Sequence, residues 1–565
     1  MPHTLDDALV TLQRWFGYSS LRPPQRRAIS AVLARRDVLV VMPTGGGKSL
    51  CFQVPAMMLD GLTIVLSPLV SLMKDQVDTL VRKGMPAVGL HGGMTAGQQA
   101  DAIAQAINGS ARMLYVAPER LVVGSTLRAL ARVKVALLAV DEAHCISEWG
   151  HEFRPAYREL QSIRGPLGAP PTIALTATAT PAVRDDIAAV CGLRNPVRIS
   201  AGFDRPNLLY AVHRVKGPRD RDRRLAELIR TRTGPSVVYA QTRSRVERVA
   251  RRLVGFGVPA VPYHAGQEAG LRRETQEAFM RGAVEVIVAT SAFGMGVDKP
   301  NVRLVVHDAI SSTLESYYQE AGRAGRDGQQ SECVLLYAPY DRRSPEYFIA
   351  ATSPPRDLVE RVYFAARREA EALLPGCPVW IDAGALARRL KAPPAQISAA
   401  LSLLVRAGAV VEERGDTNRM WVRLIATDQR LSALRDSAGF DRHLLRELWR
   451  ASRGAIRIGA MVDVAALQPG LGGVGLAAAL DAMMRDAILV WERPHAGTRL
   501  TDSARSLESW GIDWAGAAAR RKLSEARLAA MIRYAETRGC RRRVLLGYFG
   551  DVVESANCGS CDRCT

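Results

Sequence analysis

Residues 38–50 read VLVVMPTGGGKSL, an apolar run followed by three glycines and a Lys–Ser pair. We predict a buried strand over Val38–Met42, a tight loop and then a helix. The glycines let the loop turn so that its N–H groups face phosphate oxygens. Lys48 would neutralise the outer phosphates, and Ser49 would ligate Mg²⁺ at the helix N-terminus, whose dipole favours anions. The predicted phosphate-binding residues are Thr44, Gly45, Gly46, Gly47, Lys48 and Ser49.

Short apolar runs bounded by turn residues recur along the chain, with amphipathic stretches between them. This alternation is typical of a parallel sheet covered by helices. The first series of predicted strands is Val38–Met42, Thr63–Leu66, Arg112–Val116, Ala136–Val140 and Thr172–Leu175. The second series, after the charged stretch Arg219–Arg224, is Ser236–Tyr239, Ala260–Tyr263, Glu285–Ala289, Leu304–Val306 and Cys333–Tyr337. We predict two α/β domains, over residues 1–205 and 206–345, joined near Phe203–Val215.

Residues 139–157, AVDEAHCISEWGHEFRPAY, place two carboxylates directly after one of these strands. Open α/β sheets bind ligands at the carboxyl ends of their strands, so Asp141 is the predicted partner of Mg²⁺. Glu142 would polarise an attacking water. The alternative is an ordinary acidic pair at a helix N-terminus, and the glycine-rich loop argues against it.

Two further pairs of residues suit the same site. Gln25 offers a donor and an acceptor to the edge of adenine, and Arg22 would stack or pair beside it. Arg323 and Arg326, in QEAGRAGRD, are predicted to share one helix face. A guanidinium delivered across a domain cleft stabilises charge on a transferring phosphate and accelerates the reaction by roughly 10³–10⁵. The alternative for both pairs is an ordinary solvated surface.

The alternation of predicted strands and helices that marks the α/β domains ends after about Tyr340. Two predicted helices, Asp382–Leu390 and Ala395–Ala407, precede a predicted hairpin of Ala409–Glu413 and Arg419–Leu424 around the turn RGDTN. Helix, turn, helix and hairpin are typical of a winged helix, which we place at residues 346–430. A second such unit at residues 431–510 would end in a hairpin within ILVWERPHAGTRL, residues 488–500.

Four of the nine cysteines gather in the last segment, residues 511–565. Cys540 follows a long predicted helix, and the other three stand three residues apart, so tight turns can direct their thiolates at one ion. Four thiolates make a closed structural Zn²⁺ site with no open position for catalysis. Redox chemistry of the CxxC pairs is the alternative. The arginines at Arg541–Arg543 are further candidates for phosphate contacts. The predicted zinc ligands are Cys540, Cys558, Cys561 and Cys564.

The formal net charge is +20, which suggests a polyanionic partner. A GC-rich genome that favours arginine is the alternative cause of this surplus. No window approaches eighteen consecutive apolar residues, so we predict no membrane span and no membrane partner. The N-terminal residues lack a basic segment followed by an apolar one, so we expect no secretory signal and a cytoplasmic protein.

Taken in order, several stretches resemble superfamily 2 helicases, and specifically the RecQ family of DNA helicases. They span about Phe16 to Asp327, and the cysteine-rich tail resembles the RecQ zinc-binding motif. The matching stretches are FGYSSLRPPQ, MPTGGGKSLCFQ, SPLVSLMKDQV, YVAPERL, DEAHCISEWGHEFRP, ALTATAT, FDRPN, YHAG, VATSAFGMGVDKPNVRLVVH and SYYQEAGRAGRDG.

The resemblance implies an ATP-dependent DNA helicase built on two RecA-like domains, with ATP, Mg²⁺ and Zn²⁺ as cofactors. It also implies 3′-to-5′ movement, single-stranded, duplex and forked DNA as partners, and a nucleoid-associated role in repair and recombination. The implied catalytic residues are Lys48, Glu142, Arg323 and Arg326, and the implied ATP-binding set adds Arg22, Gln25 and Asp298. The implied DNA-coupling residues are His144, Trp149, Phe153, Arg154, Thr176 and Thr178.

The segment after the DEAH carboxylates resembles the RecQ loop that couples DNA contact to ATP hydrolysis. If Trp149 and Phe153 stack on bases, DNA binding moves the peptide attached to Asp141 and Glu142. Stacking is worth roughly 1–3 kcal/mol per base, which is enough to bias a loop between two states. A tryptophan packed in a core turn is the alternative. Thr176 and Thr178 would link the two domains to the nucleotide.

The chain departs from the best-known RecQ architecture, in which the zinc motif follows the helicase core and precedes the winged helix. Here the winged-helix candidates come first, so the C-terminal region is rearranged. The first predicted hairpin tip, RGDTN, carries no aromatic or imidazole ring that could separate the strands of a duplex. The second tip contains His495, which is a candidate strand-separating residue; an ordinary surface histidine is the alternative. An RNA helicase and a DNA-binding regulator that uses the motor as a switch are the competing functions.

Overall fold

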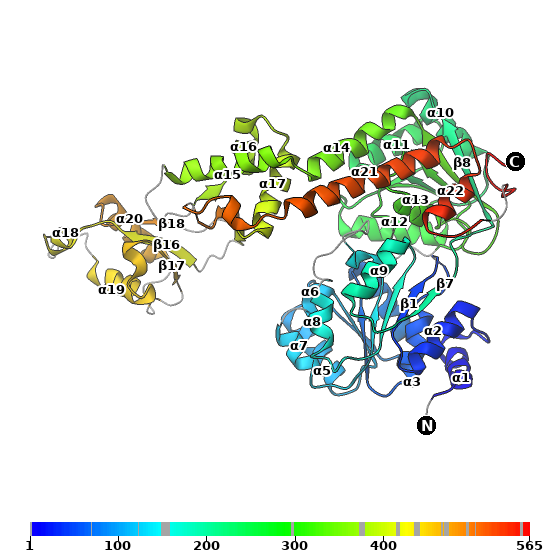
Figure 1. Cartoon of the computed structure of the whole chain (residues 1–565), viewed down its shortest axis with the longest axis horizontal. Coiled ribbons are helices and arrows are strands. Elements are labelled where there is room, and N and C mark those ends of the chain that lie inside the picture. Colours follow the sequence, from blue (N-terminus) through cyan, green and yellow to red (C-terminus); the bar gives the residue numbers. More distant parts are fainter. Residues whose placement is uncertain are drawn as a thin grey trace. The chain divides into compact units, whose positions relative to one another are not determined.

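The computed structural model describes residues 3–43, 45–68, 70–121, 124–147, 157, 159–294, 299–371, 379–413, 419–433, 441–464, 467, 474–492, 497–502, 504–553 and 557–565. The chain divides into two compact units. The first joins residues 1–345 to residues 523–565, and the second is residues 346–522 (Figure 1). None of the described helices is both long and apolar enough to cross a membrane.

The first α/β domain is built on a seven-stranded parallel sheet of order β3-β4-β2-β5-β6-β1-β7. Its central strands are continuous buried apolar runs, as expected where helices cover both faces. The strands are β1 (Val38–Val41), β2 (Leu62–Leu66), β3 (Ala87–Leu90), β4 (Met113–Val116), β5 (Val135–Val140), β6 (Thr172–Thr176) and β7 (Val197–Ser200). The helices are α1 (Leu5–Phe16), α2 (Pro23–Leu33), α3 (Leu50–Met58), α4 (Val70–Arg82), α5 (Ala96–Ile107), α6 (Pro118–Leu121), α7 (Gly124–Leu130), η1 (Ala143–Ile146), α8 (Leu160–Arg164) and α9 (Pro181–Val190).

The second α/β domain repeats this plan with a six-stranded parallel sheet of order β10-β11-β9-β12-β13-β8. Its strands are β8 (Leu208–Arg214), β9 (Ser236–Tyr239), β10 (Val261–Tyr263), β11 (Val286–Ala289), β12 (Leu304–His307) and β13 (Ser331–Tyr337). Its helices are α10 (Pro218–Arg230), α11 (Arg243–Gly255), α12 (Ala269–Arg281), α13 (Leu314–Ala321) and η3 (Pro339–Arg342). The two predicted parallel-sheet domains are confirmed, and the region expected to join them contains the edge strand β8.

The C-terminal segment of the first unit packs on the second α/β domain. It comprises the end of the long helix α21 (Trp514–Glu536), helix α22 (Arg541–Tyr548) and the final loop. Residue Cys561 of this loop forms a parallel β-bridge with Tyr210, so the loop extends the sheet beyond its edge strand β8. The Tyr534 and Tyr317 hydroxyls lie 2.8 Å apart, and both rings are buried. Tertiary packing therefore returns the tail to the α/β core after the long excursion of residues 346–522.

The second unit contains two small antiparallel sheets, of order β14-β19-β15 and β17-β16-β18. Their strands are β14 (Trp380–Ile381), β15 (Val410–Glu413), β16 (Arg419–Leu424), β17 (Ala460–Asp463), β18 (Leu489–Glu492) and β19 (Gly497–Leu500). The helices are α14 (Arg343–Thr352), which begins just before the unit, α15 (Arg356–Glu371), α16 (Ala383–Leu390), α17 (Pro394–Arg406), α18 (Asp428–Ala433), α19 (Arg442–Ala451), η4 (Ala455–Arg457), α20 (Val474–Arg485) and η6 (Glu508–Trp510). Helices with three-stranded sheets are consistent with the predicted winged-helix units.

Both predicted hairpins of this unit are wrong. Strand β15 pairs with β19, not with β16, and β16 pairs with β17 and β18. The whole second sheet is thus inserted between two partner strands of the first. The two sheets have separate hydrophobic cores, which explains why β16 does not pair with β15. Met420 and Val422 of β16 are buried together with Leu444 and Leu480, which lie between β16 and β19 in the sequence. We call residues 414–496 the inserted segment. Its two connections, 414–418 and 493–496, which include the predicted tips, lie outside the described residues.

Candidate active site and metal centre

The predicted phosphate-binding loop connects β1 to α3 in the first α/β domain. Gly45 and Gly47 have φ angles of +80° and +75°, which favour glycine. A Cβ on Gly47 would lie 2.4 Å from Nε2 of Gln25, so a side chain cannot fit there without displacing that amide. The Lys48 ammonium donates to the carbonyls of Met42 and Pro43 at 3.1 and 3.4 Å, and burial lowers its pKa. Thr44 lies outside the described residues.

Gln25 and Arg22 brace this loop from helix α2. The Gln25 amide donates to the carbonyls of Gly46 and Gly47, both at 3.2 Å, and its own oxygen accepts from the Arg22 N–H at 2.9 Å. The Arg22 guanidinium donates to the Gly45 carbonyl at 3.2 Å. Both residues therefore adjoin the predicted phosphate site, and their contact with adenine stays a prediction.

The two DEAH carboxylates stand at the carboxyl end of β5. Glu142 has a φ of +47°, a left-handed conformation that is rare outside glycine and that turns the chain sharply after the strand. Burial and the neighbouring Glu142 carboxylate raise the pKa of Asp141 to about 6. Gln76 of helix α4 donates to Asp141 Oδ2 at 3.3 Å. The stretch SPLVSLMKDQV contains Gln76, but no signal in the sequence singled this residue out.

The His144 side chain connects the carboxylates to strand β6. It is fully buried, and its Nδ1 lies 3.0 Å from Thr176 Oγ1 and 3.3 Å from Glu142 Oε2. The Thr176 hydroxyl donates to the Thr178 carbonyl at 3.2 Å and accepts from the Thr178 N–H at 3.2 Å. Three of the residues predicted to couple DNA to hydrolysis, His144, Thr176 and Thr178, are therefore joined by hydrogen bonds, and the His144 ring also lies against the Glu142 carboxylate.

A cavity of about 530 Å³ unites the predicted residues of both α/β domains. Its polar lining from the first domain includes Lys48, Ser49, Asp141 and Glu142, and the second domain contributes Gln319, Arg323 and Arg326. A ring near the loop, Tyr18, also lines it and was missed by the sequence reasoning. The site therefore brings phosphate-binding cations, two carboxylates and two guanidinium groups around a single space.

The two arginines do not share a helix face, contrary to expectation. Helix α13 ends at Ala321, and both residues follow in turns. Gly325, between them, has a φ of +54°, and a Cβ there would lie 2.5 Å from the Asn207 side chain. The helix therefore ends before either arginine, and the left-handed Gly325 keeps the stretch between them from continuing it. Arg326 nevertheless approaches the phosphate-binding loop, because a Cβ on Gly45 would lie 3.7 Å from its Cγ.

Several predicted residues lie outside the part of the chain that the structure describes. They are Trp149, Phe153 and Arg154 of the coupling segment, Asp298 of the ATP-binding set, and His495.

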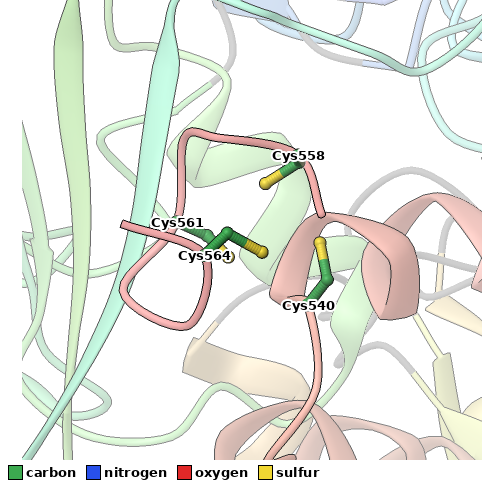
Figure 2. A group of neighbouring side chains, drawn as sticks. All are labelled: Cys540, Cys558, Cys561 and Cys564. Atoms are coloured by element: carbon green, nitrogen blue, oxygen red, sulfur yellow. The ribbon is translucent and has the colours of Figure 1, made fainter. Parts of the chain in front are cut away.

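The four C-terminal cysteines form a compact cluster. The sulfur atoms of Cys540, Cys558, Cys561 and Cys564 all lie within 4.8 Å of one another. Figure 2 shows them on two segments, with Cys540 at the start of α22 and the other three on the final loop. A tetrahedral Zn²⁺ with bonds of about 2.3 Å holds its sulfurs about 3.8 Å apart, so this cluster fits a closed zinc site.

Buried arginines anchor the cluster to the second α/β domain. Arg541 is fully buried and donates to Asp562 through Nε at 2.5 Å and Nη2 at 3.0 Å. Asp562 also accepts from the Val212 N–H on β8 at 3.1 Å. Arg542 is buried, pairs with Asp204 and donates to the Leu208 carbonyl at 2.6 Å. The suggestion that Arg541 and Arg542 contact phosphate is therefore wrong, because both guanidinium groups are buried and bind acceptors within the protein.

Comparison with known proteins identifies three matching segments. They match the family models for a DEAD/DEAH box helicase over residues 22–187, a helicase conserved C-terminal domain over 220–328, and RecQ zinc-binding over 501–565. ATP-dependent DNA helicase RecQ of Haemophilus influenzae is 45% identical over 335 residues, which cover 59% of this chain and 54% of that protein. The probable ATP-dependent DNA helicase RecS of Bacillus subtilis is 40% identical over 344 residues, which cover 61% of this chain and 69% of that protein.

The chain thus spans about half the length of the RecQ protein of Haemophilus influenzae. Among solved structures, DUF1998 helicase MrfA bound to DNA and AMPPNP aligns with a TM-score of 0.51 and 21% identity. The alignment covers 61% of this chain and 53% of that one. At this identity the likeness concerns the fold alone.

Proposed function

Because the chain belongs to the RecQ family of superfamily 2 helicases, we propose that it is an ATP-dependent DNA helicase. In this proposal it moves 3′ to 5′ along single-stranded DNA, separates duplex and forked DNA, and serves repair and recombination at the nucleoid. The names of the relatives support the activity and its class of substrate, and the geometry of the cavity supports the residue roles given below.

The cavity between the α/β domains carries the proposal. Lys48 and the loop N–H groups would bind the phosphates of ATP, and Glu142 would polarise the attacking water. Arg326 and Arg323 would stabilise charge on the transferring phosphate from the second domain. Their position on a different domain makes hydrolysis depend on how closely the domains approach one another, which is the basis of a motor.

Asp141 and Ser49 fit the requirements of a magnesium site. Both line the cavity beside Lys48, and hard oxygen ligands suit Mg²⁺. The ion would neutralise phosphate charge there. Gln76, which donates to Asp141, would keep that carboxylate oriented toward the cavity.

The contact of Glu142 with His144, and the hydrogen bonds from His144 to Thr176 and within Thr176–Thr178, support coupling. DNA contact at Trp149 and Phe153 would shift the peptide that carries Glu142, and the buried His144 would transmit the shift to β6. Trp149→Ala is expected to lower the DNA stimulation of ATP hydrolysis far more than the basal rate. Equal losses of both rates would contradict the coupling role.

The zinc cluster has a structural role in this proposal. Four thiolates leave no open coordination position, so Zn²⁺ would hold α22 and the final loop against β8 and take no part in hydrolysis. The tail is thus attached to the second α/β domain although residues 346–522 separate the two in the sequence.

The deciding experiment is an unwinding assay on 3′-tailed, 5′-tailed and forked DNA, run beside ATPase assays with DNA and with RNA. We expect ATP-dependent separation of the 3′-tailed and forked substrates and stronger stimulation by DNA. Stronger stimulation by RNA would indicate an RNA helicase. Normal ATPase without strand separation would indicate a regulator that uses its motor as a switch.

A further inference from the structure

Helix α19 of the inserted segment exposes a strongly basic face. Between Arg442 and Ile458 the sequence holds five arginines and one acidic residue, Glu447. Glu447 is buried and pairs with Arg450 at 3.0 Å, so it does not offset the charge of the other arginines. We use the name α19 basic face for Arg442, Arg446, Trp449, Arg450 and Arg453.

The spacing of these residues explains why they face solvent together. Arg442, Arg446, Trp449 and Arg450 stand at intervals of four, three and one residues along α19, and residues three and four apart lie on one side of a helix. Arg453 follows in the turn after the helix and is also exposed. The opposite side of α19 carries Leu444 and Leu448, which are fully buried in the core of the inserted segment. Among the residues that the structure describes, Arg442, Arg446 and Arg453 have no ion-pair partner. Their charges are therefore available to a polyanion.

A large aromatic side chain stands in the middle of the face. Trp449 is 43% exposed, although tryptophan usually buries most of its surface. The loop after the helix supports the ring from one side, because a Cβ on Gly454 would lie 3.3 Å from Trp449 Cζ2. The Arg457 guanidinium lies 5.9 Å from the ring centroid. The indole is therefore positioned by its neighbours and still presents surface to a ligand.

The loop beside Trp449 is held in a strained conformation. Arg453 and Gly454 have φ angles of +52° and +85°, and a left-handed arginine is uncommon. A left-handed position costs a non-glycine residue such as Arg453 roughly 1–3 kcal/mol, whereas Gly454 adopts it freely. The fully buried Ile456 anchors the loop, whereas its neighbour Ile458 is 73% exposed. The turn thus ends α19 with Arg453 and Ile458 both exposed to solvent.

We propose that the α19 basic face binds a segment of single-stranded DNA, with the arginines on phosphates and an unpaired base on Trp449. A duplex offers phosphates but keeps its bases stacked and paired, so it would leave the exposed ring without a role. A single strand offers both charge and a free base face, which is the usual combination in sites of this chemistry. The inference deepens the proposed function, because a helicase supplies single strands to a second binding surface outside its motor.

Binding of a fluorescent oligodeoxythymidylate to the full chain at several salt concentrations tests the arginines. Arg442→Gln with Arg446→Gln should weaken binding and reduce the slope of log affinity against log salt by roughly 0.7 for each phosphate that is no longer neutralised. The matched control is Arg248→Gln with Arg251→Gln, which removes two exposed charges from α11. Equal effects of the two double variants would overturn the inference, since they would reflect net charge alone.

A second arm tests the ring. Trp449→Ala should weaken single-strand binding between about 5-fold and about 100-fold, and Trp449→Phe should retain most of the affinity. Ultraviolet cross-linking of the unaltered chain to a bromodeoxyuridine oligonucleotide should map to Trp449 and needs no folded variant. Cross-links elsewhere with unchanged affinity of Trp449→Ala, or a loss confined to duplex binding, would overturn the inference.

The two proposals fail in different ways. An unaltered chain with DNA-stimulated ATPase, whose α19 variants bind single strands normally, would refute only the α19 site. An unaltered chain that binds single strands through α19 without any DNA-stimulated ATPase would refute only the helicase function.

Discussion

The imidazole of His144 lies 3.0 Å from the hydroxyl of Thr176, and the same ring nitrogen lies 3.3 Å from the carboxylate of Glu142. One buried side chain therefore spans the distance between the proposed water-polarising residue and strand β6. Strands β5 and β6 pair in the sheet, and His144 links Glu142, just after β5, to Thr176, the last residue of β6.

Replacing Thr176 with valine removes the hydroxyl at nearly constant volume. The buried His144 loses a hydrogen bond worth roughly 1–3 kcal/mol, so DNA stimulation of ATPase should fall by about 5-fold to 100-fold. The affinity for ATP should change little. The matched control is Thr172→Val at the other end of β6, whose hydroxyl donates to the Pro170 carbonyl at 3.2 Å. Thr172→Val should lower the melting temperature and leave the stimulation ratio intact.

Lys48→Ala should abolish ATP hydrolysis, because the phosphates lose their main cation. Single-strand binding should stay nearly intact, since it depends on other surfaces. ATPase and fluorescence anisotropy measured on the same preparation check both results. Loss of DNA binding together with hydrolysis would count against the assignment of Lys48.

Arg326→Ala should lower kcat of ATP hydrolysis by roughly 10³-fold, with a much smaller change in KM, because the guanidinium acts mainly on charge that develops during phosphoryl transfer. Arg232→Ala is the control, since Arg232 is in the same domain, pairs with Glu332 and does not line the cavity. A large rise in KM at unchanged kcat would instead assign Arg326 to ground-state binding.

The cysteine cluster predicts one Zn²⁺ per chain. Cys561→Ser should lose the metal and lower the melting temperature, because the final loop would no longer be fixed against Tyr210 and Asp562 would hold Arg541 less firmly. Elemental analysis and thermal denaturation measure the two effects. Cys191→Ala, at a buried thiol outside the cluster, should retain the metal. A metal-free, fully stable native protein would refute the site.

The inserted segment should be removable. Glu413 of β15 lies opposite Gly497 of β19, so residues 414–496 leave and re-enter the first small sheet at neighbouring positions. Replacement of this segment by Asn-Gly, which favours a two-residue hairpin, should leave a folded chain with normal basal ATPase. Circular dichroism and limited proteolysis would monitor folding. Unfolding of residues 346–413 in this variant would show that the two small sheets depend on each other.

The sequence predicted the α/β core well because its central strands are buried on both faces and therefore read as unbroken apolar runs. The missed strands β3, β7 and β8 are weaker signals, since β3 and β7 are only partly buried and β8 lies within a region assigned to a connection. The phosphate-binding loop, the DEAH carboxylates and the cysteine cluster were found because their spacing is local.

Strand partners in the second unit depend on information that is not local. Strands β15 and β16 are adjacent in the chain on either side of the turn-forming residues RGDTN, so a hairpin was the simplest interpretation. The true partner of β15 lies far along the sequence, and only the burial of β16 in the core of the inserted segment decides the pairing. The role of Arg542 was hidden for the same reason, because its acceptors come from β8 and the preceding linker.

Because Glu413 and Gly497 face each other on paired strands, the two ends of the inserted segment meet at one point of the small host sheet. A guest domain whose two ends meet at one point of its host can be acquired, exchanged or discarded in a single recombination event without altering the strand order around it. The inserted segment can therefore be exchanged while the strand order of the small host sheet, the motor domains and the cysteine-bearing tail stay as they are.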